Sequence, residues 1–224
     1  MEPNKSITIE NIFDLQEKCL NRAVLQLEDR YSFIKECIEF LINRHIYEEH
    51  LTEEDREKIN IIHSLLNDAV SNLIVCCKSA LYGACIESLS LLRVSLETIT
   101  IMTWKIEKGE FAETVSFNTA KQQIKAKEDI HKLYGYLSDK IVHINNRSDK
   151  YRYFEINGET YPRIGMAIDP DGTKIVLGEL MRAILYLVRI LSDFYNSKRE
   201  VVGEEYFKKK DALEQKYSEF QNSN

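Results

Sequence analysis

The residue types best suited to acid–base chemistry lie in one stretch, KLYGYLSDKIVHINNR, at residues 132–147. An imidazole titrates near neutral pH, so His143 could donate or accept a proton in a reaction. The hydroxyls of Tyr134 and Ser138 and the guanidinium of Arg147 could position a phosphate group beside it. The alternative is structural, because a histidine near the C-terminal end of a helix is favoured there by the helix dipole.

A second set of polar side chains interrupts an apolar stretch at residues 82–105. At 100° per residue, Ser90, Arg93, Glu97 and Trp104 lie on one strip of a helix, with Arg93 and Glu97 one turn apart. This strip predicts either a binding site or a buried ion pair that is satisfied within the protein. Its charges disfavour a membrane span, since each costs about 2.5–3.5 kcal/mol at the centre of a bilayer.

The sequence lacks the motifs of common catalytic folds: it has no P-loop, G-x-G-x-x-G, G-x-S-x-G or H-E-x-x-H pattern. His45 and His50 are five residues apart and lie on different sides of a helix, which disfavours a metal site between them. The five cysteines lie among apolar positions without C-x-x-C spacing, so we expect buried, reduced thiols. We therefore expect no metal and no other cofactor.

The net charge of −6 is concentrated near the start of the chain. Residues 1–60 contain 8 Lys and Arg against 14 Asp and Glu, so the remainder is neutral. Within that remainder, residues 121–152 carry eight basic and four acidic side chains. A basic face on an acidic protein can hold a phosphate or an RNA backbone, although an ordinary solvated helix has the same composition.

Hydrophobic periodicity predicts an all-α fold, an antiparallel bundle of about six to seven helices in a single domain over 1–224. Apolar side chains step by three and four residues over 20–41, which predicts one long helix over 9–45, and they do so again over 59–80. Two long helices should therefore form an N-terminal helical hairpin over 8–81. Thr52, with an aspartate three residues later, matches the pattern that caps the start of the second helix.

The middle of the chain is predicted to contain the central helix of the bundle, over 82–108. Gly83 should separate this helix from the preceding one, and the alternative is one continuous helix that contains the glycine. A weakly amphipathic surface helix is expected over 110–127. A shorter amphipathic helix should follow over 129–143.

The last third of the chain should contain an insertion and then further helices. The dipeptide Asn157-Gly158 is a strong turn signal, and it predicts a small β-hairpin near residues 151–168 within an insertion over 151–172. C-terminal helices are expected over 173–222, with a break at Gly203. The last of them has a thin aromatic seam that could dock on the bundle or on a second subunit.

Two local patterns are Leu92-Arg93 with Leu96-Glu97, and Leu137-Ser138 with Val142-His143. Together they resemble the HEPN-like helical bundles of bacteria, over roughly residues 55–195. This family contains RNA-cleaving toxins and antiphage defence proteins. In its nuclease members an Arg and a His enclose four residues, and dimerisation brings two such motifs together for metal-independent RNA cleavage.

The chain departs from this nuclease motif at one position. His143 matches the histidine, but Ser138 stands where the family has its arginine. A serine cannot supply the fixed positive charge and forked donors that an arginine offers to a scissile phosphate. The resemblance therefore implies a degenerate member.

Three functions follow from these patterns. The first is a non-catalytic homodimeric module that binds RNA, a nucleotide or a partner protein, and the resemblance places it in a defence or toxin–antitoxin system. The second is a metal-independent ribonuclease with His143 as its catalytic acid and base. The third is a structural interaction protein whose strip is a fully buried, self-paired ion pair. The expected binding residues are Arg93, Glu97, Tyr134, Ser138 and Arg147.

The first residues of the chain are polar and mixed, without the basic and then apolar pattern of a secretion signal. We therefore expect a cytoplasmic protein that does not associate with membranes.

Overall fold

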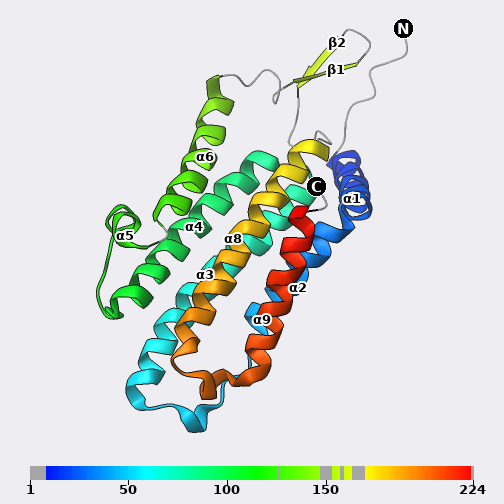
Figure 1. Ribbon diagram of the computed structural model, residues 1–224. Coiled ribbons are helices and arrows are strands. Elements are labelled where there is room, and N and C mark those ends of the chain that lie inside the picture. Colours follow the sequence, from blue (N-terminus) through cyan, green and yellow to red (C-terminus); the bar gives the residue numbers. More distant parts are fainter. Residues whose placement is uncertain (1–8, 126, 147–152, 157–158, 163–169, 223–224) are drawn as a thin grey trace.

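The computed structural model describes residues 9–125, 127–146, 153–156, 159–162 and 170–222. The fold is all-α, as predicted, and the described part has eight α-helices that pack as a bundle, against the six to seven expected (Figure 1). In chain order the elements are α1 (Ile9–Gln26), α2 (Glu28–Ile42), the 3₁₀-helix η1 (Glu48–His50), α3 (Glu53–Leu81), α4 (Cys85–Lys108), α5 (Phe117–Gln123), α6 (Lys127–Asn146), β1 (Tyr153–Ile156), β2 (Glu159–Pro162), α8 (Pro170–Asn196) and α9 (Arg199–Asn222).

Helices α3 and α4 form a long hairpin. Thr52 caps α3 as predicted, because its Oγ1 accepts a hydrogen bond from the amide of Asp55 at 3.1 Å. Gly83 has a φ of 82°, a left-handed conformation that lets the chain reverse between α3 and α4. The predicted apolar seam of α3 is buried: it consists of Ile59, Ile62, Leu66, Ala69, Leu73, Cys76 and Ala80.

Helix α8 lies in the middle of the bundle, in contact with α2, α3, α4 and α9 (Figure 1). Full burial of a Leu, Ile or Val side chain contributes about 1.5–3 kcal/mol, so α8 anchors the core. The helix begins at Pro170 instead of the expected 173, because proline suits the first turn of a helix. The buried face of α8 comprises Val176, Leu177, Leu180, Ile184, Leu187, Val188 and Leu191.

The single helix predicted over 9–45 is wrong, because the chain forms two helices, α1 and α2, that meet at Leu27. Leu27 has a non-helical φ of −123° and ψ of 28°. Its amide still donates to the Ala23 carbonyl at 2.9 Å, and its own carbonyl accepts from the Tyr31 amide at 3.0 Å. The chain bends here without losing these hydrogen bonds, and no glycine or proline marks the position.

The surface helix predicted over 110–127 is shorter than expected, because the chain first forms a loop held by Lys105. Gly109, with a φ of 71°, ends α4. The ammonium of Lys105, a residue that is 8% exposed, donates to the carbonyl oxygen of Phe111 at 2.7 Å and also to that of Glu113. These bonds satisfy a nearly buried charge, and only α5 remains helical within the predicted segment.

In the insertion predicted over 151–168, the structure describes only two strands. β1 and β2 pair antiparallel, with Tyr153 opposite Pro162 and Ile156 opposite Glu159. The Asn157-Gly158 turn and residues 163–169 lie outside the described residues. These eight strand residues alone do not establish the predicted insertion, and the fold class is defined by the helices.

Gly203 interrupts the helical conformation of α9, as predicted, with a φ of 74° and a ψ of 165°. A Cβ added there would lie 3.2 Å from Cε2 of Tyr47, in the loop after α2, so the site favours glycine for space as well as for conformation. Beyond this bend the predicted aromatic seam docks on the bundle itself. Tyr206 is buried, and the ring centroid of Tyr217 lies 5.8 Å from that of Phe33 in α2.

Of the five cysteines predicted to be buried, three are buried: Cys37, Cys76 and Cys77. Cys85 is only half-buried, so the prediction is wrong there, and the Cys19 side chain lies outside the described residues. Burial raises the pKa of the Cys37 and Cys77 thiols to about 12, and it also raises the pKa of Cys76. These thiols stay protonated at neutral pH, which makes them poor nucleophiles.

Among the described helices, α3 is the one that is long and apolar enough, by length and composition alone, to cross a membrane. Of its most apolar window, 39% is buried in the bundle. Its exposed face also carries Asn67, Asp68 and Ser71. A core helix of a soluble bundle passes the same test, so α3 is weak support for a membrane protein.

Candidate nucleic-acid interface

The structure brings together three residues that the sequence analysis singled out: Arg93 and Glu97 on α4, and Tyr134 on α6. The Tyr134 hydroxyl accepts a hydrogen bond from Arg93 Nε at 2.9 Å and donates one to Glu97 Oε1 at 2.8 Å. Arg93 Nε and Glu97 Oε1 are 3.6 Å apart. Burial, and then the hydrogen bond to Glu97, raise the pKa of Tyr134, so the phenol remains a neutral bridge between the two charges.

Aromatic and basic side chains of α5 complete this cluster. The rings of Phe117 and Tyr134 have centroids 4.6 Å apart, and Lys121 Nζ lies 5.0 Å from each centroid. The side chains of Arg93 and Glu97 are 37% and 35% exposed. The predicted alternative of a fully buried ion pair is therefore wrong: the pair is half-exposed within α4, a setting in which ion pairs contribute about 0–1 kcal/mol, and Tyr134 links it to α6.

The other residues of the predicted strip on α4 form separate hydrogen bonds. The Ser90 hydroxyl donates to the Ile86 carbonyl at 3.0 Å, within α4. The indole of Trp104 donates to Gln123 Oε1 of α5 at 2.8 Å. The strip is therefore divided among local contacts and does not form one site.

The remaining predicted site residues lie on or beyond α6. Ser138 is one turn after Tyr134, and its Oγ is buried without a hydrogen-bond partner among the described residues. The backbone of His143 is nine residues from Tyr134, about 13 Å along α6, so the Arg93 cluster does not surround it. The His143 side chain and the whole of Arg147 lie outside the described residues.

A groove follows the outer face of α8, between α6 on one side and α2 and α9 on the other. Three adjoining cavities form it, with volumes of about 450, 340 and 540 Å³. The first and second share Arg30 and Lys174, and the second and third share Tyr136 and Arg182, so the cavities adjoin one another. We call this feature the α8 groove.

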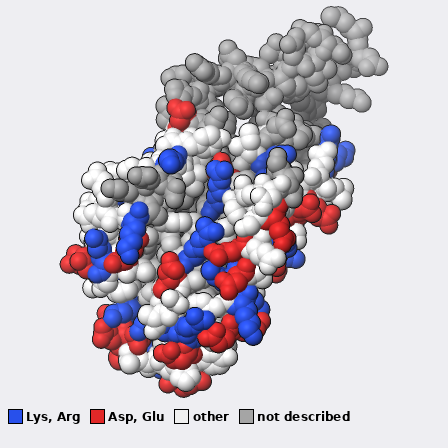
Figure 2. All heavy atoms as spheres, viewed as in Figure 1, with Lys and Arg blue, Asp and Glu red and all other residues white. Residues whose placement is uncertain are grey.

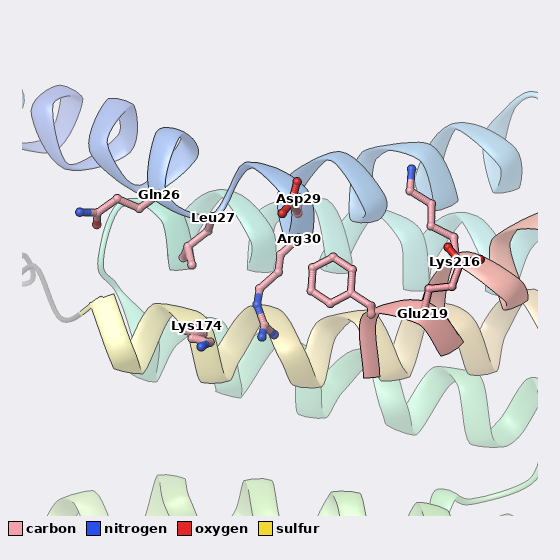
Figure 3. A pocket seen from close by; sticks show the side chains of 8 residues that line it. Gln26, Leu27, Asp29, Arg30, Lys174, Lys216 and Glu219 are labelled. Carbon is pink, nitrogen blue, oxygen red and sulfur yellow. The ribbon is translucent and has the colours of Figure 1, made fainter. Parts of the chain in front are cut away.

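Figure 3 shows the first cavity of the α8 groove, in which Arg30 extends from α2 toward α8 and Lys174 lies beside it on α8. Gly178 makes room for Arg30, because a Cβ at this position would lie 3.3 Å from Arg30 Nη1. The Arg30 guanidinium also lies over the ring of Phe220, 5.4 Å from its centroid. Arginine and aromatic side chains are therefore held side by side at this end of the groove.

Basic side chains follow the α8 groove along its length. Lys174, Arg182 and Arg189 recur at spacings of eight and seven residues, so they share one face of α8 over about 22 Å. Figure 2 shows Lys and Arg side chains in a line down the middle of this face of the molecule. Some of this charge is compensated within the protein. Arg182 lies 3.3 Å from Glu179, and Arg189 lies 2.7 Å from Glu214.

Four aromatic side chains also line the α8 groove: Tyr136, Tyr186, Tyr217 and Phe220. Tyr136 is two residues after Tyr134 but faces α8, while Tyr134 faces α4. The groove was not predicted from the sequence, because the apolar periodicity that predicts helices over 173–222 concerns only their inward faces. The signal that could have revealed the groove is the seven- and eight-residue spacing of basic residues on the opposite face.

A further polar cluster, also missed from the sequence, joins three elements at the opposite end of α2. Arg44, after α2, donates from Nε to His63 Nε2 of α3 at 3.1 Å. The buried Tyr195 hydroxyl of α8 lies 2.6 Å from the same His63 nitrogen. Two donors on one nitrogen require a neutral imidazole, and burial together with the Arg44 charge lowers the pKa of His63 to about 4.

This lowered pKa predicts a loss of stability in mild acid. Unfolded His63 binds a proton below about pH 6.5, whereas the folded protein resists protonation down to about pH 4, so stability is complete above that window and falls as the pH drops through it. Urea denaturation should give a free energy of unfolding about 2 kcal/mol lower at pH 4.5 than at pH 7.5 from this residue. The His63→Gln variant should lack this part of the pH dependence of the free energy of unfolding.

The matched control is the same change at the exposed His50, which should retain the full pH difference of the wild type. An equal pH dependence in the wild type and in His63→Gln would contradict a buried neutral imidazole.

Among the described residues, no group of three His, Cys, Asp or Glu side chains is arranged to hold a metal ion. In comparisons with known proteins, no family, no curated protein and no solved structure matches this chain. The α8 groove and the two polar clusters are the features from which a function can be proposed.

Proposed function

We propose that this chain is a non-catalytic, HEPN-like module that binds single-stranded RNA in the α8 groove. The observation that carries the proposal is the combination of basic and aromatic side chains along the three adjoining cavities of this groove. Such grooves bind single strands without strong sequence preference, because phosphates contact the cations while bases stack on the rings.

Electrostatics supports an anionic, extended ligand. The groove contains Arg30, Lys132, Lys174, Arg182 and Arg189 on a protein whose net charge is −6. Lys216 also lines the groove, and its acidic lining residues are Asp29, Glu179 and Glu219, of which Glu179 is only 14% exposed and is paired with Arg182. The surface offered to a ligand is therefore more basic than the chain as a whole, which favours a phosphate backbone.

Stacking supports single-stranded over double-stranded RNA. The four aromatic side chains lie inside cavities between helices, where an unpaired base can reach them and a base in a duplex cannot. Each stacked base contributes about 1–3 kcal/mol. The largest of the three groove cavities, about 540 Å³, is lined by three tyrosines and is the expected position of a base.

Catalysis is not part of the proposal. Arg93, a cation that could replace the missing arginine of the nuclease motif, already contacts Tyr134 and Glu97. Ser138 supplies no charge that could stabilise the transition state, and the other candidate cation, Arg147, lies outside the described residues. The ribonuclease alternative requires metal-independent RNA cleavage in EDTA that is lost in His143→Ala, and our proposal requires that neither protein cleaves.

We also propose that the module is a homodimer and that the outer face of the α3–α4 hairpin is its interface. Ile74, Val75 and Val94 are 41%, 49% and 48% exposed. The contact between Cys76 Sγ and the Ser88 carbonyl, at 3.2 Å, sets the alignment of the hairpin and places these apolar residues within about one turn of each other. An exposed apolar patch marks an interaction site, and in a two-fold dimer the same patch of both copies meets.

Weakening the positive charge of the α8 groove should weaken RNA binding. The measurement is a fluorescence anisotropy titration with a labelled single-stranded RNA of about ten nucleotides. Lys174→Gln combined with Arg189→Gln should lower the affinity about tenfold. The same double variant should reduce the salt slope, which is the slope of the logarithm of the binding constant against the logarithm of the salt concentration, by about 2. Tyr136→Leu should cost about 1–3 kcal/mol while leaving the salt slope unchanged.

The matched control is Lys35→Gln with Arg56→Gln, which removes the same charge from exposed ion pairs outside the groove. Equal losses in the two double variants, or no binding by the wild type at low salt, would overturn the RNA proposal.

A charge in the apolar patch should dissociate the dimer. Sedimentation velocity at micromolar concentration should show a wild-type dimer and a Val94→Glu monomer with an unchanged circular dichroism spectrum, because a carboxylate buried at an interface loses its hydration. Asn60→Glu, an exposed change on α3 outside the patch, should remain dimeric. A monomeric wild type would refute this interface.

A further inference from the structure

Arg44 is a partly buried cation without an acidic partner. This residue comes just after the end of α2. Its Nη1 donates a hydrogen bond to the Leu41 carbonyl oxygen, and its Nε donates one to His63. Among the described residues, no carboxylate forms an ion pair with Arg44. Arg44 also forms a side-chain hydrogen bond with Tyr195. A guanidinium has five N–H donors, so these three contacts still leave part of it unused. An uncompensated charge in a partly desolvated position is costly, which distinguishes Arg44 from the paired arginines of the surface.

The neighbours of Arg44 fix its position but supply no negative charge. His63 Nε2 is an acceptor for both Arg44 and the Tyr195 hydroxyl, so the imidazole stays neutral. Tyr195 is completely buried, and burial raises the pKa of its phenol to about 12. The guanidinium is therefore held by neutral groups from α3 and α8, and its charge remains available to a ligand.

Arg44 also lines a cavity of about 440 Å³ between the end of α2 and the first half of α9, separate from the α8 groove. Other polar side chains reach the same cavity: they are Asn43, His45, Tyr47, Tyr206 and Lys209. Tyr206 is buried, and its hydroxyl lies 3.4 Å from Ser192 Oγ. The cavity that Arg44 lines therefore has donor groups on both of its walls.

Three glutamates line this cavity as well, but each is exposed and paired with a lysine. The side chains of Glu36, Glu39 and Glu205 are 50%, 57% and 71% exposed. Glu36 contacts Lys216, Glu39 lies 3.8 Å from Lys35, and Glu205 lies 4.0 Å from Lys209. Exposed pairs of this kind are screened by water, so they do not neutralise Arg44.

We propose that this cavity binds a small oxyanion, a phosphate or carboxylate group, through the unused donors of Arg44. A planar guanidinium holds two oxygens of such a group in parallel, and a charge-assisted bond is stronger in a partly desolvated cavity than in water. Binding joins α2, α3 and α9, because Arg44, His63 and the α9 wall meet at this point. The site is independent of RNA binding in the α8 groove.

The test is thermal unfolding in sodium phosphate, sodium acetate and sodium chloride at matched ionic strength. The wild type should unfold about 2–4 °C higher in phosphate or acetate than in chloride, because an anion that binds only the folded state stabilises it. The oxyanion that gives the larger rise identifies the preferred group. Arg44→Met should show no difference among the three salts.

His63→Glu provides a second, independent variant. It places a carboxylate beside Arg44, so it should also abolish the response to added oxyanions while keeping the arginine. Arg56→Met, which removes an exposed cation of α3, and Lys174→Gln in the α8 groove should both respond as the wild type does. An equal response in the wild type, Arg44→Met and His63→Glu would overturn the proposal, as would the absence of a response in the wild type.

Discussion

The burial of α8 among α2, α3, α4 and α9 is the constraint on which the rest of the structure depends. Its inner face supplies a large part of the apolar core, and its position forces the other helices to pack around it. Because the neighbouring helices do not cover its outer face, a strip with Lys174, Arg182 and Arg189 remains open between α6 and α9. The α8 groove is thus a direct consequence of how the core is assembled.

The same packing produces two polar clusters with different electrostatic outcomes. Around Tyr134, the charges of Arg93 and Glu97 are balanced within the protein, so the cluster can fix α6 against α4 without a ligand. Around Arg44, the neighbours are a neutral imidazole and a buried phenol, so the positive charge is not balanced. The cluster around Tyr134, which the sequence indicated, therefore needs no ligand to balance its charges. The cluster around Arg44, which the sequence did not indicate, has a positive charge that a ligand could balance.

Local patterns determine how much of this could be predicted. The seam of α3, the cap at Thr52 and the turn at Gly83 depend on neighbouring residues, and the sequence predicted all three correctly. The bend at Leu27 has no local signal, because an ordinary residue adopts it while the surrounding hydrogen bonds persist. Packing against distant parts of the chain determines this bend.

For contacts between helices, the sequence indicated at most which residues take part. Arg93, Glu97 and Tyr134 were each singled out, but their meeting depends on how α4 packs against α6. Arg44, His63 and Tyr195 come from three distant parts of the chain, and nothing in their spacing indicates that they meet. A groove is also a property of packing, so only the basic stripe of α8 was visible in the sequence.

Mapping of photo-crosslinked RNA is the most direct test of the central claim, that the α8 groove holds a single strand. A single-stranded RNA containing photoreactive uridine would be irradiated with the wild-type protein, and the modified residues would be located by mass spectrometry. We predict crosslinks at Tyr136, Tyr186 or Tyr217, the tyrosines that line the groove. Crosslinks confined to other surfaces, such as the outer face of the α3–α4 hairpin, would contradict the account.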